Sequence, residues 1–200
     1  MITLYHAPRS RSSRIVWLLE ELETPYQIEI VPIMRGDGTG APAPDSYLGI
    51  HPLRKVPAIK LNNEIVYESG AICLYLTDAF QKKEIGPLPG HNDRAEYVRW
   101  LFLYAGALEP AATARFRGWD KDPAGTGFGK FEDIEAIIAR QLESSPYMLG
   151  ERFSAADILY GSAVLFFRGS LFPQRKCYDD YLARLSARPA HVRAQAKDNG

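Results

Sequence analysis

The sequence predicts two domains, a mixed α/β domain over residues 1–80 and an all-helical domain over residues 92–200. Three observations predict this division. Residues 1–80 alternate strand-like and helix-like hydrophobic patterns, residues 81–91 are rich in proline and glycine and form a linker, and apolar residues after position 92 recur at helical spacing. With 46% hydrophobic residues in a chain of 200, each domain has enough apolar side chains for a core.

The order of elements in residues 1–80 predicts a thioredoxin-like domain. Residues 2–5 form a short strand, a polar turn follows at residues 6–12, and apolar side chains at helical spacing lead to a second strand over residues 26–31. A strand, helix, strand unit of this kind is normally parallel and right-handed. After a loop rich in glycine and proline, two further strands and a helix complete the β-α-β, loop, β-β-α order.

The second pair of strands forms a hairpin around two asparagines. Pro57 begins an alternating run, and proline is tolerated only at the start, edge or bend of a strand. Asn62 and Asn63 tolerate the left-handed backbone of a two-residue turn. The return strand covers residues 65–67, and the apolar spacing becomes helical after Gly70.

Glu68 and Ser69 stand where this last helix begins. Unpaired backbone N–H groups, the helix dipole and the Ser69 hydroxyl together suit a carboxylate. The Glu68 carboxylate beside them can hold an ammonium group. The pair therefore predicts a site for a ligand that carries both groups on one carbon, as an α-amino acid does.

The composition excludes several kinds of partner. The formal net charge is zero, so no overall basic field favours nucleic acid or an anionic membrane surface. No apolar run is long enough to span a bilayer, and no charged and apolar leader precedes the first strand. We therefore expect a cytoplasmic protein.

The cysteines and histidines predict neither a disulfide nor a metal site. Cys73 and Cys177 lie far apart and form no C-x-x-C pair, which argues against a dithiol redox centre. Cys73 falls within an apolar helix, so we expect a buried structural thiol. The four histidines show no metal-ligand spacing, and no bound metal is expected.

The stretch Lys-Val-Pro, followed by a hairpin and Glu-Ser-Gly, resembles the glutathione-binding half of the cytosolic glutathione S-transferases. The resemblance implies that the bond between Val56 and Pro57 is cis and that the Val56 backbone pairs with the cysteinyl backbone of glutathione. It also implies that Glu68 and Ser69 bind the γ-glutamyl end of the tripeptide. The expected fold is that of the family, with glutathione as co-substrate.

The turn at residues 6–12 holds the candidates for activating the glutathione thiol. Alignment of Pro8 and Arg14 with the matching proline and arginine of the serine-type transferases places Ser10 on their catalytic serine, with Ser12 and Ser13 as competitors. Ser10 or Ser12 can instead simply cap the following helix. Arg11 stands near the place where the cysteine-type bacterial transferases carry their cysteine, so it can add positive charge near the sulfur or be an ordinary surface residue. The absence of that cysteine counts against a thiol reductase, and the turn resembles a branch shared by bacteria and fungi.

The remaining candidate residues are those expected to bind the glycyl end of glutathione or the electrophile. Lys55 and His51 are candidates for contacting the glycyl carboxylate of glutathione, although a solvated surface position is the competing interpretation for each. The resemblance places an electrophile pocket between the domains, which would be lined from the first long helix. Its candidates are Tyr104, Leu108, Arg115 and Phe116, although aromatic residues at helical spacing more often belong to a core.

The second domain reads as helices throughout. The first is expected from about residue 93 to 114 with a bend at Pro110, and the next spans residues 131–142. Ser154 and Asp157 form a capping box, because the serine can accept from the third helical N–H while the aspartate reaches back. We assign them to folding rather than to chemistry. Shorter helices are expected at residues 178–186 and after Pro189.

The expected activity is attack of the glutathione thiolate on a small hydrophobic electrophile, by a protein that is a homodimer as the resemblance implies. Two alternatives remain open from the sequence. One is a glutathione-dependent peroxidase or isomerase acting at the same site. The other is a non-enzymatic interaction protein, since a fold does not fix a function.

Overall fold

The computed structural model describes residues 1–120 and 125–198. These residues form two compact units, the first made of residues 1–83 and 189–198 and the second of residues 84–188. A thioredoxin-like sheet domain and a set of helices are present as predicted. Within the described ranges, no helix is long and apolar enough to cross a bilayer.

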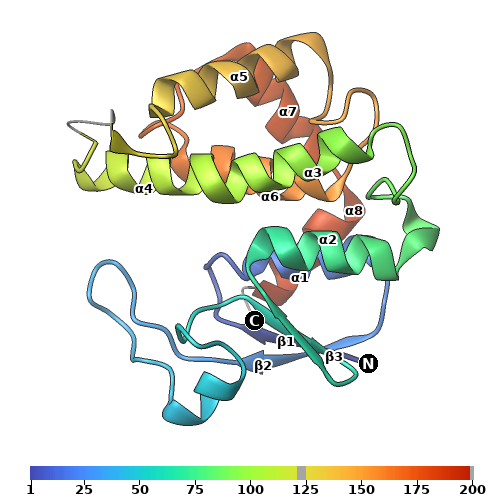
Figure 1. Cartoon of the computed structure of the whole chain (residues 1–200), viewed down its shortest axis with the longest axis vertical. Helices are drawn as coiled ribbons and strands as arrows, with labels where there is room; N and C mark the ends of the chain where they lie inside the picture. Colours follow the sequence, from blue (N-terminus) through green and yellow to red (C-terminus); the bar gives the residue numbers. More distant parts are fainter. Residues whose placement is uncertain (121–124, 199–200) are drawn as a thin grey trace. The chain divides into compact units, whose positions relative to one another are not determined.

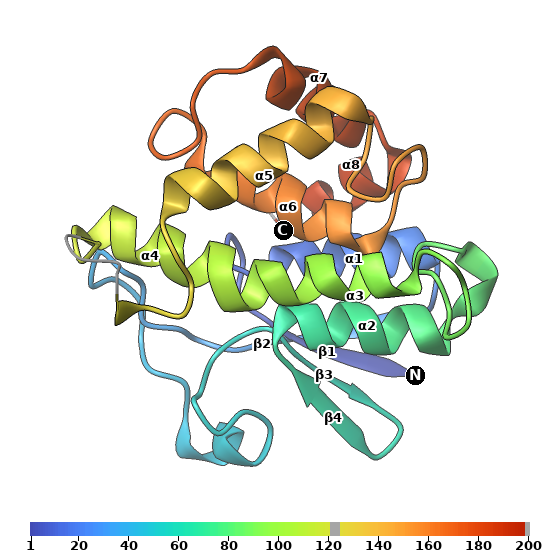
Figure 2. The same cartoon turned by 45° about the horizontal axis from the view of Figure 1, so that its top comes forward.

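The first unit is built on a four-stranded sheet with the order β2-β1-β3-β4. Its strands are β1 (Ile2–His6), β2 (Tyr26–Ile30), β3 (Ala58–Leu61) and β4 (Glu64–Tyr67). β1 and β2 are parallel, whereas β1–β3 and β3–β4 are antiparallel. β3 and β4 form the predicted hairpin at the sheet edge (Figure 2), and Asn62 adopts a positive φ of 56° in its turn.

Helices α1 (Ser13–Leu22) and α2 (Ser69–Ala79) lie over one face of this sheet (Figure 1). Because side chains alternate along a strand, Leu4 points toward these helices and Tyr5 toward the opposite face. The loop between β2 and β3, with its 3₁₀ turn η1 (Asp45–Gly49), covers that second face. Tyr47 from η1 packs against Tyr5 with a ring separation of 5.5 Å. A second 3₁₀ turn, η2 (Gln81–Lys83), follows α2.

The final helix, α8 (Pro189–Asp198), packs on α1 and belongs to the first unit. The Arg193 guanidinium binds the Glu20 carboxylate at 2.8 Å, and the His191 ring meets the Trp17 ring edge-on at 4.6 Å. Its helical spacing predicted that this helix belongs to the helical domain. The pattern of one helix does not show which partner it packs on, and here the partner is α1.

The second unit contains the remaining helices. They are α3 (Arg94–Leu103), the π turn η3 (Tyr104–Leu108), α4 (Glu109–Arg117), α5 (Phe131–Ser144), α6 (Ala155–Phe167) and α7 (Lys176–Ser186). α3, η3 and α4 follow one another along a single rod (Figure 2). The predicted single helix is thus interrupted by a π turn just before Pro110, where proline offers no N–H to the preceding turn.

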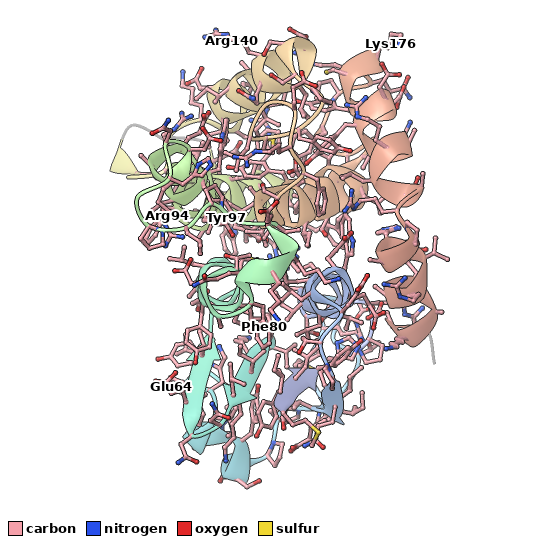
Figure 3. All side chains as sticks on the ribbon, turned by 90° about the vertical axis from the view of Figure 1, so that its right-hand side faces the viewer. Glu64, Phe80, Arg94, Tyr97, Arg140 and Lys176 are labelled. Carbon is pink, nitrogen blue, oxygen red and sulfur yellow. The ribbon has the colours of Figure 1, made fainter. Side chains whose placement is uncertain are left out.

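Helix α6 forms the core of the second unit. Its Tyr160 hydroxyl donates to the Trp100 carbonyl at 3.0 Å, and the Tyr160 ring meets the rings of Trp100 and Tyr104 edge-on. Charged side chains such as Arg140 on α5 and Lys176 on α7 stand on the outside of the unit (Figure 3). The capping box of Ser154 and Asp157 begins α6 as predicted.

Gly161 lets α6 and α7 approach closely. A Cβ at position 161 would collide with the buried Leu185 side chain of α7. We expect Gly161→Ala to reduce the free energy of unfolding by about 1–3 kcal/mol, because the packed core must expand. Gly106→Ala is the matched control, since a Cβ there meets nothing within 4 Å. Urea denaturation measures both, and equal stability of the two variants would contradict the close packing.

Candidate functional site

Three segments meet at one end of the sheet in the first unit. Tyr5 is paired with Ala58, and Ala58 in turn with Tyr67. This register brings the turn after β1, the Val56–Pro57 pair before β3 and the residues after β4 to the same end of the sheet. Both helices over the sheet also begin there, so two helix N-termini face this region.

The turn after β1 presents its two candidate serines differently. Ser12 is fully buried, and its Oγ lies 2.8 Å from Nδ1 of His6 and 3.1 Å from both the amide nitrogen and the carbonyl oxygen of Ala7. It occupies the N-cap position of α1, but its hydroxyl makes no capping bond. Ser10 is half-buried, accepts the Ser12 N–H at 3.1 Å and lies 2.7 Å from the Ser12 hydroxyl. Arg11 is exposed.

The hairpin ends in an unusual backbone conformation. The Val56–Pro57 bond is cis, as predicted. Glu68 has a φ of +71°, a conformation that residues other than glycine rarely adopt, and such residues gather at ligand-binding positions. Ser69 follows as the first residue of α2 and is 9% exposed. The Glu68 carboxylate is exposed.

His51 and Lys55 differ in accessibility. His51 is 2% exposed, its Nδ1 accepts the Leu53 N–H at 3.1 Å, and its ring lies 4.7 Å from that of Tyr67. Burial lowers the pKa of His51, and the nearby Glu68 carboxylate partly opposes this shift. The Lys55 side chain is exposed, so of the two it is the more accessible to a carboxylate in solvent.

The predicted electrophile residues all lie in the second unit and differ in exposure. Tyr104 and Leu108 are buried in its core, and the Tyr104 hydroxyl donates to Glu109. Arg115 binds Asp120 at 2.6 Å and also pairs with Glu132. Phe116 is 63% exposed and lies beside Phe167.

His6 and Asp198 join the two serines in one cluster at the turn after β1, and neither was predicted from the sequence. Nε2 of the buried His6 lies 3.2 Å from Oδ1 of Asp198, the last residue of α8. Asp198 also accepts the Ser13 hydroxyl at 2.6 Å and the Arg9 N–H at 3.1 Å. The position of His6 at the end of a strand pointed only weakly to a functional role. No local pattern points to Asp198, because the contact joins residues that lie near opposite ends of the sequence.

Cys73 is fully buried, as predicted, and burial raises the pKa of its thiol to about 12. It therefore stays protonated and is no nucleophile at neutral pH. Among the residues described, no group of three or more histidine, cysteine, aspartate or glutamate side chains is arranged to hold a metal ion.

The chain is similar to known proteins along most of its length. Residues 9–79 match the model of the glutathione S-transferase N-terminal domain. The chain is 32% identical to glutathione S-transferase 3 of Schizosaccharomyces pombe, with 78% of this chain and 70% of that protein covered. It is 30% identical to the disulfide-bond oxidoreductase YfcG of Escherichia coli, with 79% and 76% covered.

One solved structure extends the similarity to the full fold. It is a glutathione transferase homologue from Sulfitobacter with bound glutathione, which is 26% identical, has a TM-score of 0.72 and covers 98% of both chains. The S. pombe relative exceeds 30% identity over more than two thirds of this sequence. The chain belongs to the glutathione S-transferase family.

Proposed function

We propose that this glutathione transferase conjugates the thiolate of glutathione to small hydrophobic electrophiles. The observation that carries the proposal is the strand register, which brings the Ser10 turn, Val56–Pro57 and Glu68–Ser69 to one end of the sheet. Ala7 of the turn and Val56 also share one buried cluster. A tripeptide bound along this end would meet a hydroxyl, the backbone segment that precedes β3 and a helix N-terminus in turn.

The hairpin supplies the proposed binding contacts. The α-carboxylate of the γ-glutamyl residue would bind the N-terminus of α2 and the Ser69 hydroxyl, and Glu68 would hold the α-ammonium. Val56 lies outside the paired register, which begins at Ala58, so its backbone is free to pair with the cysteinyl backbone. The exposed Lys55 is the proposed partner of the glycyl carboxylate. The buried His51 would hold the loop before Lys55 in place by accepting the Leu53 N–H.

Ser10 is the proposed partner of the sulfur. A free thiol has a pKa near 8.5, so most glutathione is protonated and unreactive at neutral pH. The N-terminus of α1 stabilises the thiolate by about 0.3–1 kcal/mol, and a donated hydroxyl hydrogen bond adds about 1.5–3 kcal/mol. At about 1.4 kcal/mol per unit, the two effects together lower the thiol pKa by roughly one to three units. Ser10 is favoured over Ser12, whose hydroxyl is buried among protein partners.

The electrophile would be held by the helical unit, with Phe116 as the exposed apolar candidate and Arg115 beside it. The burial of Tyr104 and Leu108 supports a role for them in shaping the core beneath such a pocket. We further propose that the protein acts in detoxification, in the cytoplasm and as a homodimer, in line with the family.

The proposed function is tested by incubating the protein with glutathione and a nitro-activated aryl halide and following thioether formation. We expect conjugation above the uncatalysed rate, with saturation in glutathione. Ultraviolet difference titration of bound glutathione should show thiolate well below the pKa of the free thiol. Absence of both signals would overturn the proposal and favour a binding protein on this fold.

A second candidate is disulfide reduction, which the similarity to YfcG favours. The same thiolate can attack a disulfide sulfur in place of a carbon. The first turn carries no cysteine, so a second glutathione would have to resolve the mixed disulfide. Turnover of a small disulfide substrate that exceeds aryl halide conjugation would favour this reaction.

Ser69→Ala tests the proposed hydrogen bond between the Ser69 hydroxyl and the γ-glutamyl α-carboxylate. Loss of a hydrogen bond to a charged group costs about 1.5–3 kcal/mol, so we expect the Kd for glutathione to rise about tenfold or more. The maximal rate at saturating glutathione should change little. Calorimetric titration measures the Kd, with Ser144→Ala, at the end of α5, as the control. A Kd that matches the unmodified protein would exclude Ser69 from the site.

A further inference from the structure

Four side chains form a continuous chain of contacts that runs inward from Ser10. Ser10 Oγ lies 2.7 Å from Ser12 Oγ, which lies 2.8 Å from Nδ1 of His6, whose Nε2 lies 3.2 Å from Oδ1 of Asp198. All four residues belong to the first unit. His6 and Ser12 are each at most 1% exposed, so the middle of the chain is shielded from solvent.

The protons in this chain can be arranged in only a few ways. Ser12 Oγ accepts the Ala7 N–H and has one proton of its own, which can be directed to His6, to Ser10 or to the Ala7 carbonyl. When His6 is neutral with its proton on Nε2, its Nδ1 accepts a hydrogen bond from the Ser12 hydroxyl. The Ser12 oxygen can then accept a hydrogen bond from the Ser10 hydroxyl, so that both hydroxyls donate in the direction of His6.

We propose that this chain, from Ser10 through Ser12 to His6 with Asp198 behind it, takes up the proton that glutathione loses when its thiolate forms. The inference rests on the proposed function, because it assigns a destination to the thiol proton of that reaction. The S–H bond breaks and its proton goes to Ser10, the Ser10 proton goes to Ser12, and the Ser12 proton forms a new N–H bond at Nδ1 of His6.

The products of this step are one thiolate and one imidazolium, and both serines remain neutral. Afterwards every hydroxyl points outward, with His6 donating to Ser12, Ser12 to Ser10 and Ser10 to the sulfur. The same transfer therefore creates the hydrogen bond that stabilises the thiolate. Ser12 and His6 do not touch the substrate and are positioning residues.

The surroundings of His6 suit a proton acceptor. The Asp198 carboxylate faces the His6 ring from α8 at an ion-pair distance. The geometry is not that of a hydrogen bond, because the Nε2–H bond does not point directly at the oxygen. The Ser13 hydroxyl and the Arg9 N–H hold Asp198 in place. The charged group that reaches the turn from the loop after β2 is Arg35, whose guanidinium binds two backbone carbonyls of the turn at 2.8 and 3.3 Å.

The resting protonation of His6 follows from two opposing effects. Burial lowers the pKa of His6, and the Asp198 carboxylate opposes this with a smaller raising effect. The net lowering keeps His6 neutral at neutral pH before glutathione binds. A thiolate at the other end of the chain adds a second negative charge, which favours the imidazolium.

A proton inventory tests the inference separately from the proposed function. Glutathione is titrated into the protein at about pH 7.5, where the free thiol is mostly protonated. Ultraviolet absorbance reports the thiolate that forms, and calorimetry in buffers of different ionisation enthalpy reports the protons released. We expect a thiolate signal with close to zero protons released, because the proton stays on His6.

His6→Gln removes the proton acceptor, and Asp198→Asn is the milder variant that keeps the ring. In His6→Gln we expect either loss of the thiolate signal or a thiolate accompanied by about one proton released to solvent. Asp198→Asn should raise the pKa of the bound thiol. His91→Gln, at an exposed position in the segment before α3, should match the unmodified protein.

The outcomes separate the two ideas. A thiolate in the unmodified protein with about one proton released would overturn the relay and leave the transferase reaction standing. Unchanged thiolate and proton counts in His6→Gln would also overturn it. Absence of any thiolate in the unmodified protein would overturn the proposed activation of glutathione, and the relay with it.

Discussion

Ser10→Ala is expected to raise the pKa of bound glutathione by about one to two units, because a hydroxyl bond to a thiolate contributes about 1.5–3 kcal/mol. Conjugation at neutral pH should fall about 10- to 100-fold. The Kd for glutathione should change little, since the groups proposed to bind its carboxylate and ammonium remain. The pH profile of conjugation should move upward by the same amount as the thiol pKa.

The measurement combines a thiolate titration with steady-state rates as a function of pH. Ser10→Thr keeps a hydroxyl at the same position and should recover part of the activity. Retention of the low thiol pKa in Ser10→Ala would remove Ser10 from the proposed role. The N-terminus of α1 or Arg11 would then have to stabilise the thiolate.

Asp157→Ala is expected to cost about 3–5 kcal/mol of unfolding free energy, more than the 0.5–2 kcal/mol of a simple helix cap. The buried carboxylate accepts the Ser154 N–H and the Met148 N–H, both at 2.8 Å, and the Tyr181 hydroxyl at 2.9 Å. The Ser154 hydroxyl also donates to it at 3.1 Å, so removal of the carboxylate takes an acceptor from four buried donors, of which the Tyr181 hydroxyl keeps the Asp157 carbonyl at 3.3 Å. Each such donor costs about 1–3 kcal/mol, and partial relaxation reduces the sum.

Asp133→Ala is the matched control for this prediction. Asp133 holds the third position of α5, as Asp157 does in α6, but it is exposed. Its loss should cost no more than the helix dipole interaction, about 0.3–1 kcal/mol. Urea denaturation followed by fluorescence and circular dichroism measures both variants. Similar costs at the two positions would show that the buried network adds nothing to the cap.

The pH dependence of stability should also change at Asp157. Burial raises the pKa of this carboxyl to about 6, against the lowering effect of its hydrogen-bond donors. A folded pKa above the unfolded value means that the folded state binds the proton more tightly. The stabilising contribution is therefore complete below about pH 4 and is lost as the pH rises through about 6. Asp157→Asn should lack this dependence.

Features set by short segments were the most predictable. The hairpin followed from two asparagines between alternating runs, and Asn62 indeed adopts the left-handed backbone. The capping box followed from the spacing of Ser154 and Asp157. In each case the residues that specify the structure are neighbours in the chain, so that the local pattern is sufficient.

Features set by packing were less predictable. Helical spacing suggested one helix through Pro110, but a π turn precedes it. The sequence left Ser12 as a competitor of Ser10, and the difference in their burial became visible only in the structure. The contact between His6 and Asp198 depends on α8 packing on α1, which no spacing rule reports. Glu68 and Ser69 followed from their position at a helix N-terminus, whereas Ser10 came from a family resemblance, and the roles of all three remain predictions.

The return of α8 to the first unit has a consequence for biosynthesis. The sheet, α1 and α2 leave the ribosome before residues 84–188, and α8 follows only after them. Domains tend to fold as their chain emerges, so the nascent sheet folds while the α8-binding surface of α1 is still exposed to solvent. This surface includes the Glu20 carboxylate, which Arg193 binds only once α8 has formed. The proposed site is thus completed late: both serines and the hairpin can be in place before the carboxylate of Asp198 has been synthesised.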